Sequence, residues 1–395
     1  MNLKKNISTI SYFDVDQKNG GAIFAKNMDV FLNSTDQFAS LVYCNKRSQI
    51  SEQYKENESV KVSNGNLVQR MKDSLKKSKT FEFLIHFLRN DLNAIILSFR
   101  LFFKNKIKKD TILLFHDHLS LFYFSFFFNL RNRKIVMIMH NNGSPIEMIS
   151  SEIKNTTKRK VVNAISNFQI KSIVSKVDKI VFLCDNARFR FMELYNVNKQ
   201  QTTTIPNGIK SFKIDHSKQN NNEKIRFITV CTMNERKGID LFIKCLPVLN
   251  EKFASKISFT LIGQGPLLEE LKHLSTLYTN LNVVGESSEV SDFLDKSDVF
   301  FLLSRNEGQP LSILEALRAS LFVIATDVGC NSSMINDKNG LLIDVSEQSI
   351  VDAFSRVIIE WDSYKGKGEN SLKLFNESFT EEKMYDSYLQ IFNSL

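Results

Sequence analysis

The sequence predicts an α/β protein built from two doubly wound, Rossmann-like domains. Short runs of Val, Ile, Leu and Phe alternate with helical patterns along nearly all of the 395 residues. Such alternation is typical of parallel sheets with helices on both faces. Many of the runs are continuously apolar, as in strands that are buried on both faces. The runs are too numerous for one sheet of usual size, so we expect two sheets.

Five apolar runs predict strands in the first half: Asn6–Tyr12, Ser40–Cys44, Thr111–Phe115, Lys134–Met139 and Lys179–Leu183. Six runs predict strands in the second half: Ile225–Cys231, Ile257–Ile262, Asn282–Val284, Asp298–Ser304, Leu321–Thr326 and Gly340–Asp344. The domain junction is expected near Gln200–Lys213, because Pro206-Asn207-Gly208 favours a turn. We therefore expect one domain over residues 1–205, a second over 206–371, and a terminal helix over 372–395.

Composition excludes several classes of protein. Hydrophobic residues make up 43% and charged residues 24% of the chain, which is typical of a globular protein rather than a disordered or fibrous one. The longest apolar run, Leu119–Phe128, is half of what a spanning helix needs. The first residues lack the apolar core and cleavage site of a secretory signal. Five scattered cysteines, never in C-x-x-C spacing, disfavour a disulfide framework or a zinc ribbon and fit a reducing cytoplasm.

The net charge of +9 is unevenly distributed, because residues 1–210 are strongly basic and residues 211–395 are acidic overall. Such asymmetry suggests two domains with different partners, although ordinary solvated lysines would also explain it. Between Lys72 and Lys109 an apolar stripe recurs at helical spacing among ten basic residues. Its members are Phe81, Leu84, Ile85, Leu88, Leu92, Ile95, Ile96, Phe99 and Phe103.

We expect that stripe to pack on the core of its domain. The basic residues around it could instead meet an anionic membrane surface, and both uses are compatible on different faces. Nucleic acid is a weaker candidate, since no helix-turn-helix, zinc finger or aromatic RNA-binding signature is present.

Ligands of open α/β sheets bind beyond the carboxyl ends of the strands, so the loops there are candidate sites. Gly20-Gly21 follows the first strand and could let backbone N–H groups approach a phosphate. Gly263-Gln264-Gly265-Pro266 follows another strand, and Arg236-Lys237 could clamp a diphosphate at a third. Each of these segments could equally be a plain turn.

The most informative segment runs from Asp298 to Ala316. A buried strand delivers Glu307 to its carboxyl end, Gly308-Gln309-Pro310 turns the chain, and a helix starts near Leu311 with free N–H groups. Glu315 lies in that helix and can point to the same crevice. A pair of glutamates at this spacing is expected about once by chance, so the context of the pair carries the prediction.

Histidines close two strands of the first half. His140 follows the strand at 134–139, whereas His116 and His118 follow the strand at 111–115. A histidine before a glycine-containing loop is well placed to meet a ligand, although a lone histidine is more often structural. No third ligand of suitable spacing accompanies His116 and His118, so we predict no metal site.

Together these motifs resemble the family 4 retaining glycosyltransferases, whose GT-B architecture has two Rossmann-like domains facing a central cleft. The E-x7-E signature of that family resembles Glu307 to Glu315, and its V-I-A-T-D-V-G segment is matched at Val323–Gly329. Its remaining motifs resemble Gly20-Gly21, Asn207-Gly208, Gly263–Pro266, Asn339–Leu342 and His140.

The resemblance implies transfer of a sugar from a nucleotide-diphosphate donor with retention of the anomeric configuration and without a metal. Its implied catalytic residues are Glu307, His140 and Lys237. The implied donor-binding residues are Gly20, Gly21, Arg236, Lys237, Gly263, Gly265, Glu307, Gly308, Gln309, Leu311, Ser312 and Glu315. Glu315 would bind the ribose, and Lys237 would neutralise the departing diphosphate. No cofactor is implied, and a UDP-sugar is the expected co-substrate. By the same resemblance, the domain over 1–205 would bind the acceptor, the domain over 206–371 would bind the nucleotide sugar, and the helix over 372–395 would cross back to the first domain.

Two positions depart from the family pattern. Thr232 stands where a phosphate-binding Arg is usual, which questions donor affinity unless Arg236 replaces it, and Ser333 stands where a Glu commonly follows the V-G-G loop. The leading prediction is a cytoplasmic enzyme of bacterial surface-polysaccharide or glycoconjugate synthesis, acting on a glycan or lipid-linked acceptor at the inner membrane face. The alternatives are a non-catalytic sugar- or protein-binding partner of the same fold and a nucleotide-sugar epimerase or hydrolase.

Overall fold

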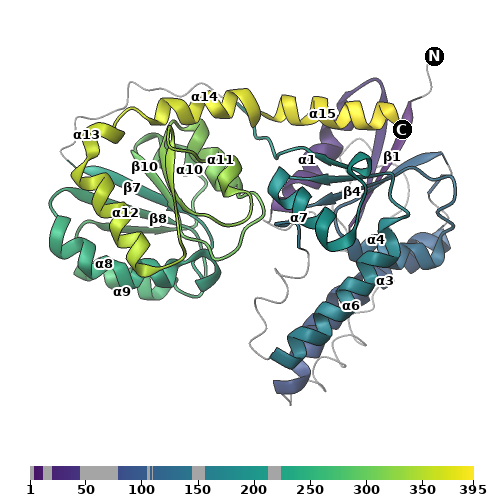
Figure 1. The fold of residues 1–395 in the computed structure, drawn as a ribbon, viewed down its shortest axis with the longest axis horizontal. Helices are drawn as coiled ribbons and strands as arrows, with labels where there is room; N and C mark the ends of the chain where they lie inside the picture. The colour runs from purple at the N-terminus through teal and green to yellow at the C-terminus, as the bar shows by residue number, and fades with distance from the viewer. Residues whose placement is uncertain are drawn as a thin grey trace. The chain divides into compact units, whose positions relative to one another are not determined.

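The computed structural model describes residues 4–11, 20–44, 79–104, 107–108, 110–144, 156–211 and 224–395 (Figure 1). The chain divides into two compact units. The first comprises Met1–Phe182, Arg188–Thr204 and Gln390–Leu395, and the second comprises Leu183–Ala187 and Ile205–Leu389. Each unit contains one six-stranded sheet in which every pair of neighbouring strands is parallel. The predicted α/β fold with two Rossmann-like sheets is therefore confirmed.

The sheet of the first unit has the strand order β2-β1-β3-β4-β5-β6. Its strands are β1 (Lys5–Ile10), β2 (Phe38–Tyr43), β3 (Thr111–Phe115), β4 (Ile135–Met139), β5 (Lys179–Phe182) and β6 (Thr202–Thr204). The chain crosses from the β2 side of β1 to the opposite side, where β3 lies, so the strand order reverses between β1 and β3. This switch point is the place where doubly wound sheets bind ligands.

Helices cover that sheet: α1 (Gly20–Ser34), α3 (Lys79–Lys104), α4 (His118–Phe127), α6 (Thr156–Val174) and α7 (Asp185–Tyr195). Asp117 caps α4, because its carboxylate accepts a hydrogen bond from the N–H of Ser120 at 2.6 Å. A short helix, η2 (Lys199–Gln201), precedes β6. Both α3 and α6 extend well beyond the sheet (Figure 1).

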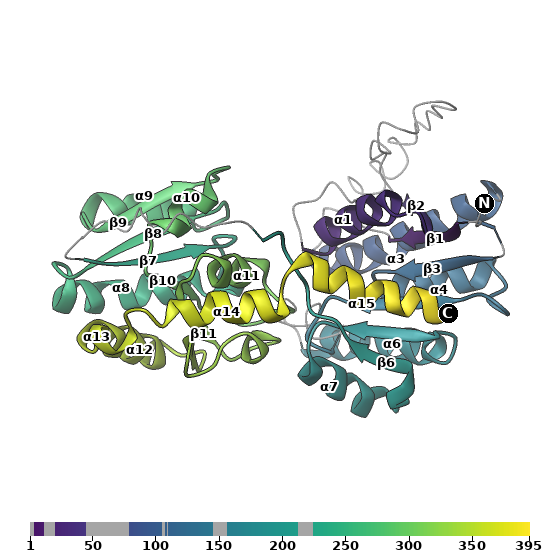
Figure 2. The same ribbon diagram turned by 90° about the horizontal axis from the view of Figure 1, so that it is seen from above.

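The sheet of the second unit has the order β12-β11-β10-β7-β8-β9 (Figure 2). Its strands are β7 (Ile225–Val230), β8 (Ile257–Ile262), β9 (Leu281–Gly285), β10 (Val299–Leu302), β11 (Phe322–Thr326) and β12 (Gly340–Ile343). This is the strand order of a dinucleotide-binding Rossmann sheet, and its switch point lies between β7 and β10.

Two apolar layers hold this sheet between helices. One layer joins α8 (Ile239–Phe253), α9 (Leu268–Leu277) and α12 (Glu347–Ile359) to one face, around Phe227 and Phe259. The other joins α10 (Val290–Asp295), α11 (Leu311–Arg318) and α14 (Gly368–Ser378) to the opposite face, around Phe300. Smaller elements complete the unit: η4 (Glu235–Lys237), η5 (Asn331–Ser333) and α13 (Trp361–Tyr364).

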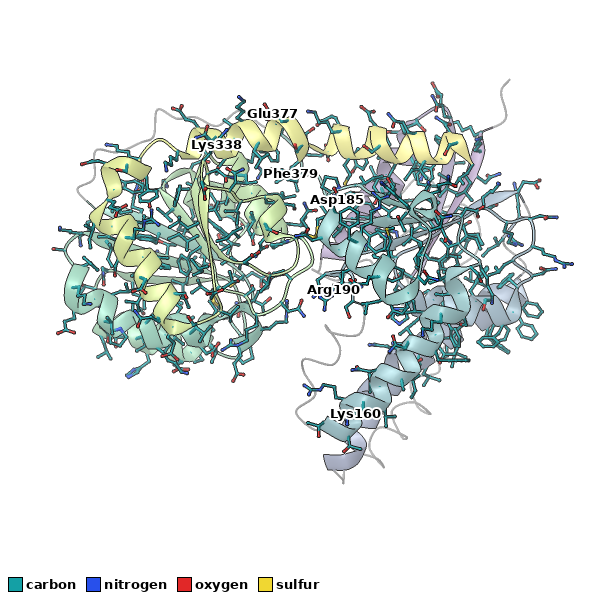
Figure 3. All side chains as sticks on the ribbon, in the orientation of Figure 1. Lys160, Asp185, Arg190, Lys338, Glu377 and Phe379 are labelled. Carbon is teal, nitrogen blue, oxygen red and sulfur yellow. A yellow bond between two sulfur atoms is a disulfide. The ribbon has the colours of Figure 1, made fainter. Side chains whose placement is uncertain are left out.

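The terminal segment is two helices, so the prediction of one helix over 372–395 was wrong. The chain leaves α14 at Phe379 and enters α15 (Glu381–Ser394) (Figure 3). The helix is interrupted here because its backbone pairs with Ile209. The N–H of Ile209 donates to the carbonyl of Phe379, and the carbonyl of Ile209 accepts from the N–H of Glu381. A helix cannot continue through backbone groups that pair with another segment. The predicted assignment of domain roles stays a prediction.

The strand predictions were close, and β3 and β8 match to the residue. The strand β6 was missed because Thr202–Thr204 was read as part of the junction loop. It is a three-residue edge strand paired only with β5, so it carries almost no periodicity of its own. Residues 212–223, which include the end of the predicted junction, lie outside the described residues.

The predicted core stripe of α3 was partly wrong. Its members Phe81, Leu84, Ile85 and Leu88 lie outside the described side chains. Among the others, Leu92, Phe99 and Phe103 are 41%, 50% and 68% exposed. The core is instead reached by the adjacent positions Ala94, Leu97 and Leu101. Both faces of the helix carry apolar residues, so spacing alone did not identify the buried one.

Cys184 and Cys330 form a disulfide across a sequence separation of 146 residues. The sequence disfavoured disulfides because the five cysteines show no recurrent spacing, yet the fold brings these two to a Cα–Cα distance of 5.7 Å. Bonds of this kind persist in oxidising surroundings, so the cytoplasmic setting stays a prediction. None of the described helices is long and apolar enough to cross a membrane.

Candidate functional site

The switch point of the second sheet gathers the strongest sequence candidates. Arg236 and Lys237 lie on η4 in the loop after β7, and Glu307 lies in the loop after β10. Since β7 and β10 are neighbours in the sheet, the two loops leave it side by side. The topology therefore brings Arg236 and Lys237 together with Glu307, which lies 70 residues after Lys237 in the sequence.

Glu307 is the centre of this cluster. It is 5% exposed, and its Oε1 forms an ion pair with Nζ of Lys237. The same oxygen accepts a hydrogen bond from Oγ of Ser304 at 2.6 Å, while Oε2 lies 3.9 Å from Nη1 of Arg236. A buried carboxylate requires such partners. Within this cluster of Arg236, Lys237 and Glu307, two positive groups and one negative group leave a net positive charge, which favours an anionic ligand.

Local structure fixes the direction of the two cations. The side chain of Asn234 caps η4 by accepting from the N–H of Lys237 at 3.0 Å. Nη1 of Arg236 donates to the carbonyl of Asn306 at 3.2 Å, which directs that guanidinium across to the β10 loop. Thr232, at the position where the resembled family has an arginine, is exposed.

The loop after β11 supports the Glu307 turn from one side. The N–H of Cys330 donates to the carbonyl of Gly308 at 2.9 Å, and Oγ1 of Thr326 donates to the carbonyl of Ser304 at 2.6 Å. A side chain at Gly329 would collide with the carbonyl of Glu307. The matched segment Val323–Gly329 therefore supports the turn that carries Glu307.

The residues after Glu307 form the N-terminus of α11. Leu311 and Ser312 are the first two residues of that helix, so their N–H groups have no partner within the helix and can face an anion. The side chain of Gln309 is buried, and its Oε1 accepts from the N–H of Asn207 at 2.6 Å. That bond ties the N-G junction to the turn.

Glu315 is half-buried one turn further along α11. Burial raises the pKa of its carboxyl group, and the nearby Arg318 lowers it. A carboxylate in this setting gains from hydroxyl groups that replace lost water, as the ribose hydroxyls of a nucleotide would.

The predicted glycine turn Gly263–Pro266 follows β8, next to β7 in the sheet. Side chains at Gly263 or Gly265 would collide with the carbonyls of Cys231 or Met233 in the loop after β7. These glycines therefore have a packing reason to be present. Their predicted contact with a donor stays a prediction.

The first unit gathers its own candidates at one edge of its sheet. Nδ1 of His116, after β3, lies 3.0 Å from Nε2 of His140, after β4. The ring of Phe24 lies against both, with centroid distances of 5.5 and 5.3 Å. Phe24 belongs to α1, whose first two residues are Gly20 and Gly21. The glycine pair and His140 thus belong to elements that meet at this edge, as the sequence predicted for each separately.

Burial keeps these imidazoles neutral. It lowers the pKa of His140 to about 4, and it lowers that of His116 well below its ordinary value, with a further contribution from His140. The pKa of the buried His118 is lowered to about 4 for the same reason. A neutral His140 can accept or donate a hydrogen bond to a sugar hydroxyl. Among the described residues, no group of three His, Cys, Asp or Glu side chains could hold a metal ion.

Two interactions of the predicted residues were missed. Ser304 holds Glu307, and His116, which was considered only as a possible metal ligand, orients His140. The sequence contained a signal for each, because Ser304 ends a predicted strand three positions before Glu307 and His116 directly follows another predicted strand. Ser333, the second departure from the family pattern, lies on η5, where its hydroxyl donates to the carbonyl of Cys330 at 2.7 Å.

Residues 211–373 match the model of the family Glycosyl transferases group 1. This part of the chain is therefore similar to the group 1 glycosyltransferases. It contains Arg236, Lys237, Glu307 and Glu315, so the cluster at the second switch point lies within the matched region.

Curated relatives agree with this similarity to the group 1 glycosyltransferases. The uncharacterized glycosyltransferase MJ1069 of Methanocaldococcus jannaschii is 26% identical over 282 residues, which cover 68% of this chain and 71% of that protein. An Escherichia coli UDP-Gal:alpha-D-GlcNAc-diphosphoundecaprenol alpha-1,3-galactosyltransferase is 29% identical over 42% of this chain and 47% of its own length. The chain thus spans about half of the second relative.

Solved structures give the same architecture. Sucrose-phosphate synthase from Thermosynechococcus elongatus superposes with a TM-score of 0.72 at 16% identity over 99% of both chains. The lipopolysaccharide outer core galactosyltransferase WaaB superposes with a TM-score of 0.67 at 13% identity, over 99% of this chain and all of the other. At these identities the likeness establishes the fold, which is the GT-B glycosyltransferase fold.

Proposed function

We propose that this protein is a glycosyltransferase that moves a sugar from a nucleotide-diphosphate donor to a glycan or lipid-linked acceptor, with retention of the anomeric configuration. The observation that carries the proposal is the ion pair of the partly buried Lys237 with the buried Glu307 at the switch point of the second sheet. The pair lies in the region that matches the family, next to the turn that opens α11.

Diphosphate recognition follows from the charges at this point. Lys237 and Arg236 supply two cations, and the first N–H groups of α11 supply a partial positive charge. As the bond between the sugar and the diphosphate breaks, negative charge grows on the leaving oxygen. Cations already fixed near that oxygen stabilise the charge without reorganisation. Arg236 would take the place of the phosphate-binding arginine that Thr232 replaces.

Glu307 would lie beside the donor sugar, where its carboxylate can accept hydrogen bonds from sugar hydroxyls. We propose no covalent intermediate. The acceptor oxygen would attack on the face from which the diphosphate leaves, and the leaving phosphate oxygen would take up the acceptor proton. His140 would position the acceptor or contact the sugar as a neutral imidazole, in line with its lowered pKa.

Glu315 would bind the ribose hydroxyls of the donor, for which we propose a UDP-sugar and no metal ion. The E. coli relative uses UDP-Gal by its name, and the solved structure of HepE from Anabaena was determined in complex with UDP. That structure superposes with a TM-score of 0.66 at 12% identity, so it supports the choice of donor only by analogy.

The acceptor is proposed to be a glycan or a lipid-linked sugar in bacterial surface-polysaccharide or glycoconjugate synthesis. The names of two E. coli relatives describe an O-antigen chain mannosyltransferase and an enzyme acting on diphosphoundecaprenol-linked GlcNAc. A lipid-linked acceptor is anchored in a membrane by its chain, so we propose that the protein associates peripherally with the inner face of a membrane.

A thermal-shift panel of UDP-, GDP- and ADP-sugars tests the donor site. We expect one nucleotide class to raise the melting temperature of the wild type, and Glu315→Ala to lose most of that shift. Glu270→Ala, an exposed glutamate on α9, is the matched control and should keep it. A wild type that responds to no donor would contradict the proposal. Retention is tested separately, by the anomeric configuration of the product.

The exposed Thr232 favours a second candidate function, a non-catalytic partner that binds sugars or proteins through the same fold. Glu307→Gln separates the two functions, because an enzyme loses turnover whereas a scaffold keeps its binding partner. An epimerase or hydrolase would release a changed sugar in the absence of any acceptor, which product analysis of the donor alone reveals.

A further inference from the structure

Three helices of the first unit carry an unusual concentration of exposed apolar side chains. Five of the six exposed phenylalanines in the described chain lie on α3, α4 and α6. We call this set the aromatic surface; its members are Leu92, Phe99, Phe102, Phe103, Phe126, Val161, Ile165 and Phe168. Large apolar patches on a monomer mark an interaction site.

The phenylalanines of the aromatic surface are not scattered, because ring contacts connect them in two clusters. Phe99 and Phe103 have centroids 4.4 Å apart, and Phe99 also meets Phe127 at 6.0 Å. On the other side, Phe122 meets both Phe126, at 5.0 Å, and Phe168, at 6.2 Å. Both clusters draw on α4, so they lie on either side of one helix.

The exposed apolar residues of α3 recur along one face of that helix, and those of α6 do the same. On α3 the positions are 92, 99 and 103, and on α6 they are 161, 165 and 168, which repeat at three-, four- and seven-residue intervals. Both helices extend beyond the sheet (Figure 1). Lys160 lies on the extending part of α6 (Figure 3).

Basic side chains outnumber acidic ones in the part of the first unit that carries the aromatic surface. In the described parts of 90–178 the cations that are not buried are Arg100, Lys108, Arg131, Arg133, Lys134, Arg159, Lys160, Lys171 and Lys176. The acidic side chains that are not buried in the same parts are Asp110, Asp117 and Asp178. The excess of positive charge favours an anionic partner.

A hollow of about 500 Å³ lies next to the aromatic surface. It is lined by three of these cations, Arg131, Arg133 and Lys176, and by one carboxylate, Asp178, so its cations are in excess. Phe128 also lines it, and the ring of Phe128 lies 5.8 Å from that of Phe102. Arg133 is held at this hollow because its Nη1 donates to the carbonyl of Lys108 at 3.1 Å and its Nε donates to that of Asn129 at 3.3 Å. The hollow has the size and charge to receive a phosphate headgroup.

We propose that the aromatic surface inserts into the interface of a bilayer that contains anionic phospholipid, with a headgroup phosphate at Arg131 and Arg133. Phenylalanines at the interface supply apolar burial, and each cation near the surface adds about 1 kcal/mol of attraction. A second copy of the chain is a poorer occupant, because a two-fold interface would bring identical cationic surfaces together. This proposal rests on the proposed function, because membrane binding would serve the transfer of a sugar to a lipid-linked acceptor.

Vesicle sedimentation of the full chain tests the surface. Phosphatidylcholine vesicles are compared with vesicles containing phosphatidylglycerol. We expect binding to the anionic vesicles that weakens at high salt. Phe103→Asp with Phe126→Asp should weaken it at least about tenfold, because charges replace inserted rings, and Arg131→Glu with Arg133→Glu should abolish the preference for anionic lipid. Ile359→Asp, at a residue 70% exposed on α12, is the matched control.

Each outcome has a distinct meaning. Wild-type protein that stays in the supernatant with anionic vesicles overturns the proposal, and so does an equal loss in Ile359→Asp. Oligomers that Phe103→Asp with Phe126→Asp converts to monomers would assign the surface to a second copy instead. The surface variants should show the same donor-induced thermal shift as the wild type. Measuring that shift therefore distinguishes a failure of this proposal from a failure of the proposed function.

Discussion

Nδ1 of His116 lies 3.0 Å from Nε2 of His140, and their rings are nearly parallel, with an interplanar angle of 10°. A hydrogen bond at this distance requires one imidazole to donate and the other to accept. The arrangement couples the tautomers of the two rings, because whichever of these nitrogens donates, the other must accept, and it lets His116 orient His140.

The histidine pair predicts a loss of stability in mild acid. The pKa of His140 falls from 6.5 to about 4 on folding, so the unfolded chain binds protons that the folded chain excludes. The contribution of His140 to the free energy of unfolding is therefore fully present above pH 6.5. It is lost as the pH falls towards 4, by about 1.4 kcal/mol per pH unit for each extra proton that the unfolded chain binds. Urea denaturation of His140→Asn should show a shallower decline over that window. An unchanged slope would contradict the burial of a neutral His140, and exposed His273→Asn serves as the control.

Glu307→Gln should separate donor binding from turnover. The substitution keeps the volume of the side chain but removes the charge that neutralises Lys237, leaving the site more positive. We expect the affinity for a nucleoside diphosphate to stay or rise, and kcat to fall at least about a hundredfold, as for other preorganised charges. Calorimetry and initial rates measure the two effects. Glu347→Gln, which breaks the exposed pair with Lys244, should change neither, and parallel losses of affinity and rate would assign Glu307 to folding.

Gly329→Ala should disturb the turn that carries Glu307. Gly329 has a φ of +61°, and a methyl group there meets the carbonyl of Glu307. Gly366 has a φ of +86° but nothing within 4 Å of its added carbon. Gly366→Ala should therefore cost about 1–2 kcal/mol from conformation alone. Gly329→Ala should cost more and should also lower turnover. Equal effects on stability and activity would argue against the close contact.

The disulfide predicts a redox dependence of stability. A cross-link between Cys184 and Cys330 closes a long loop, and removing such a bond costs about 2–5 kcal/mol. A reducing agent should lower the melting temperature of the wild type but not that of the variant with both cysteines replaced by Ala. Peptide mapping of unreduced protein checks the pairing directly. Alkylation of both thiols in native protein without reductant would contradict the bond.

Several features of the site could be read from the chain alone because they are local. The run 299–302, the turn at 308–310 and the helix from Leu311 follow from apolar continuity, glycine and proline chemistry, and helix capping. Glu307 and Lys237 were chosen because each follows a predicted strand. Parallel strands end at the same edge of a sheet, so the sequence could place both residues at one edge without a coordinate.

The sequence by itself determined the fold class, the edge of the sheet where the site lies and the types of residue in it, because these depend on periodicity and on turn chemistry. Only the tertiary structure decided which partners meet across long separations. Ser304 as the support of Glu307, His116 as the partner of His140, and the pairing of Cys184 with Cys330 depend on strand order and packing. The same holds for α3, whose buried face depends on neighbouring helices that supply the contacts, and no spacing within the helix itself contains that information.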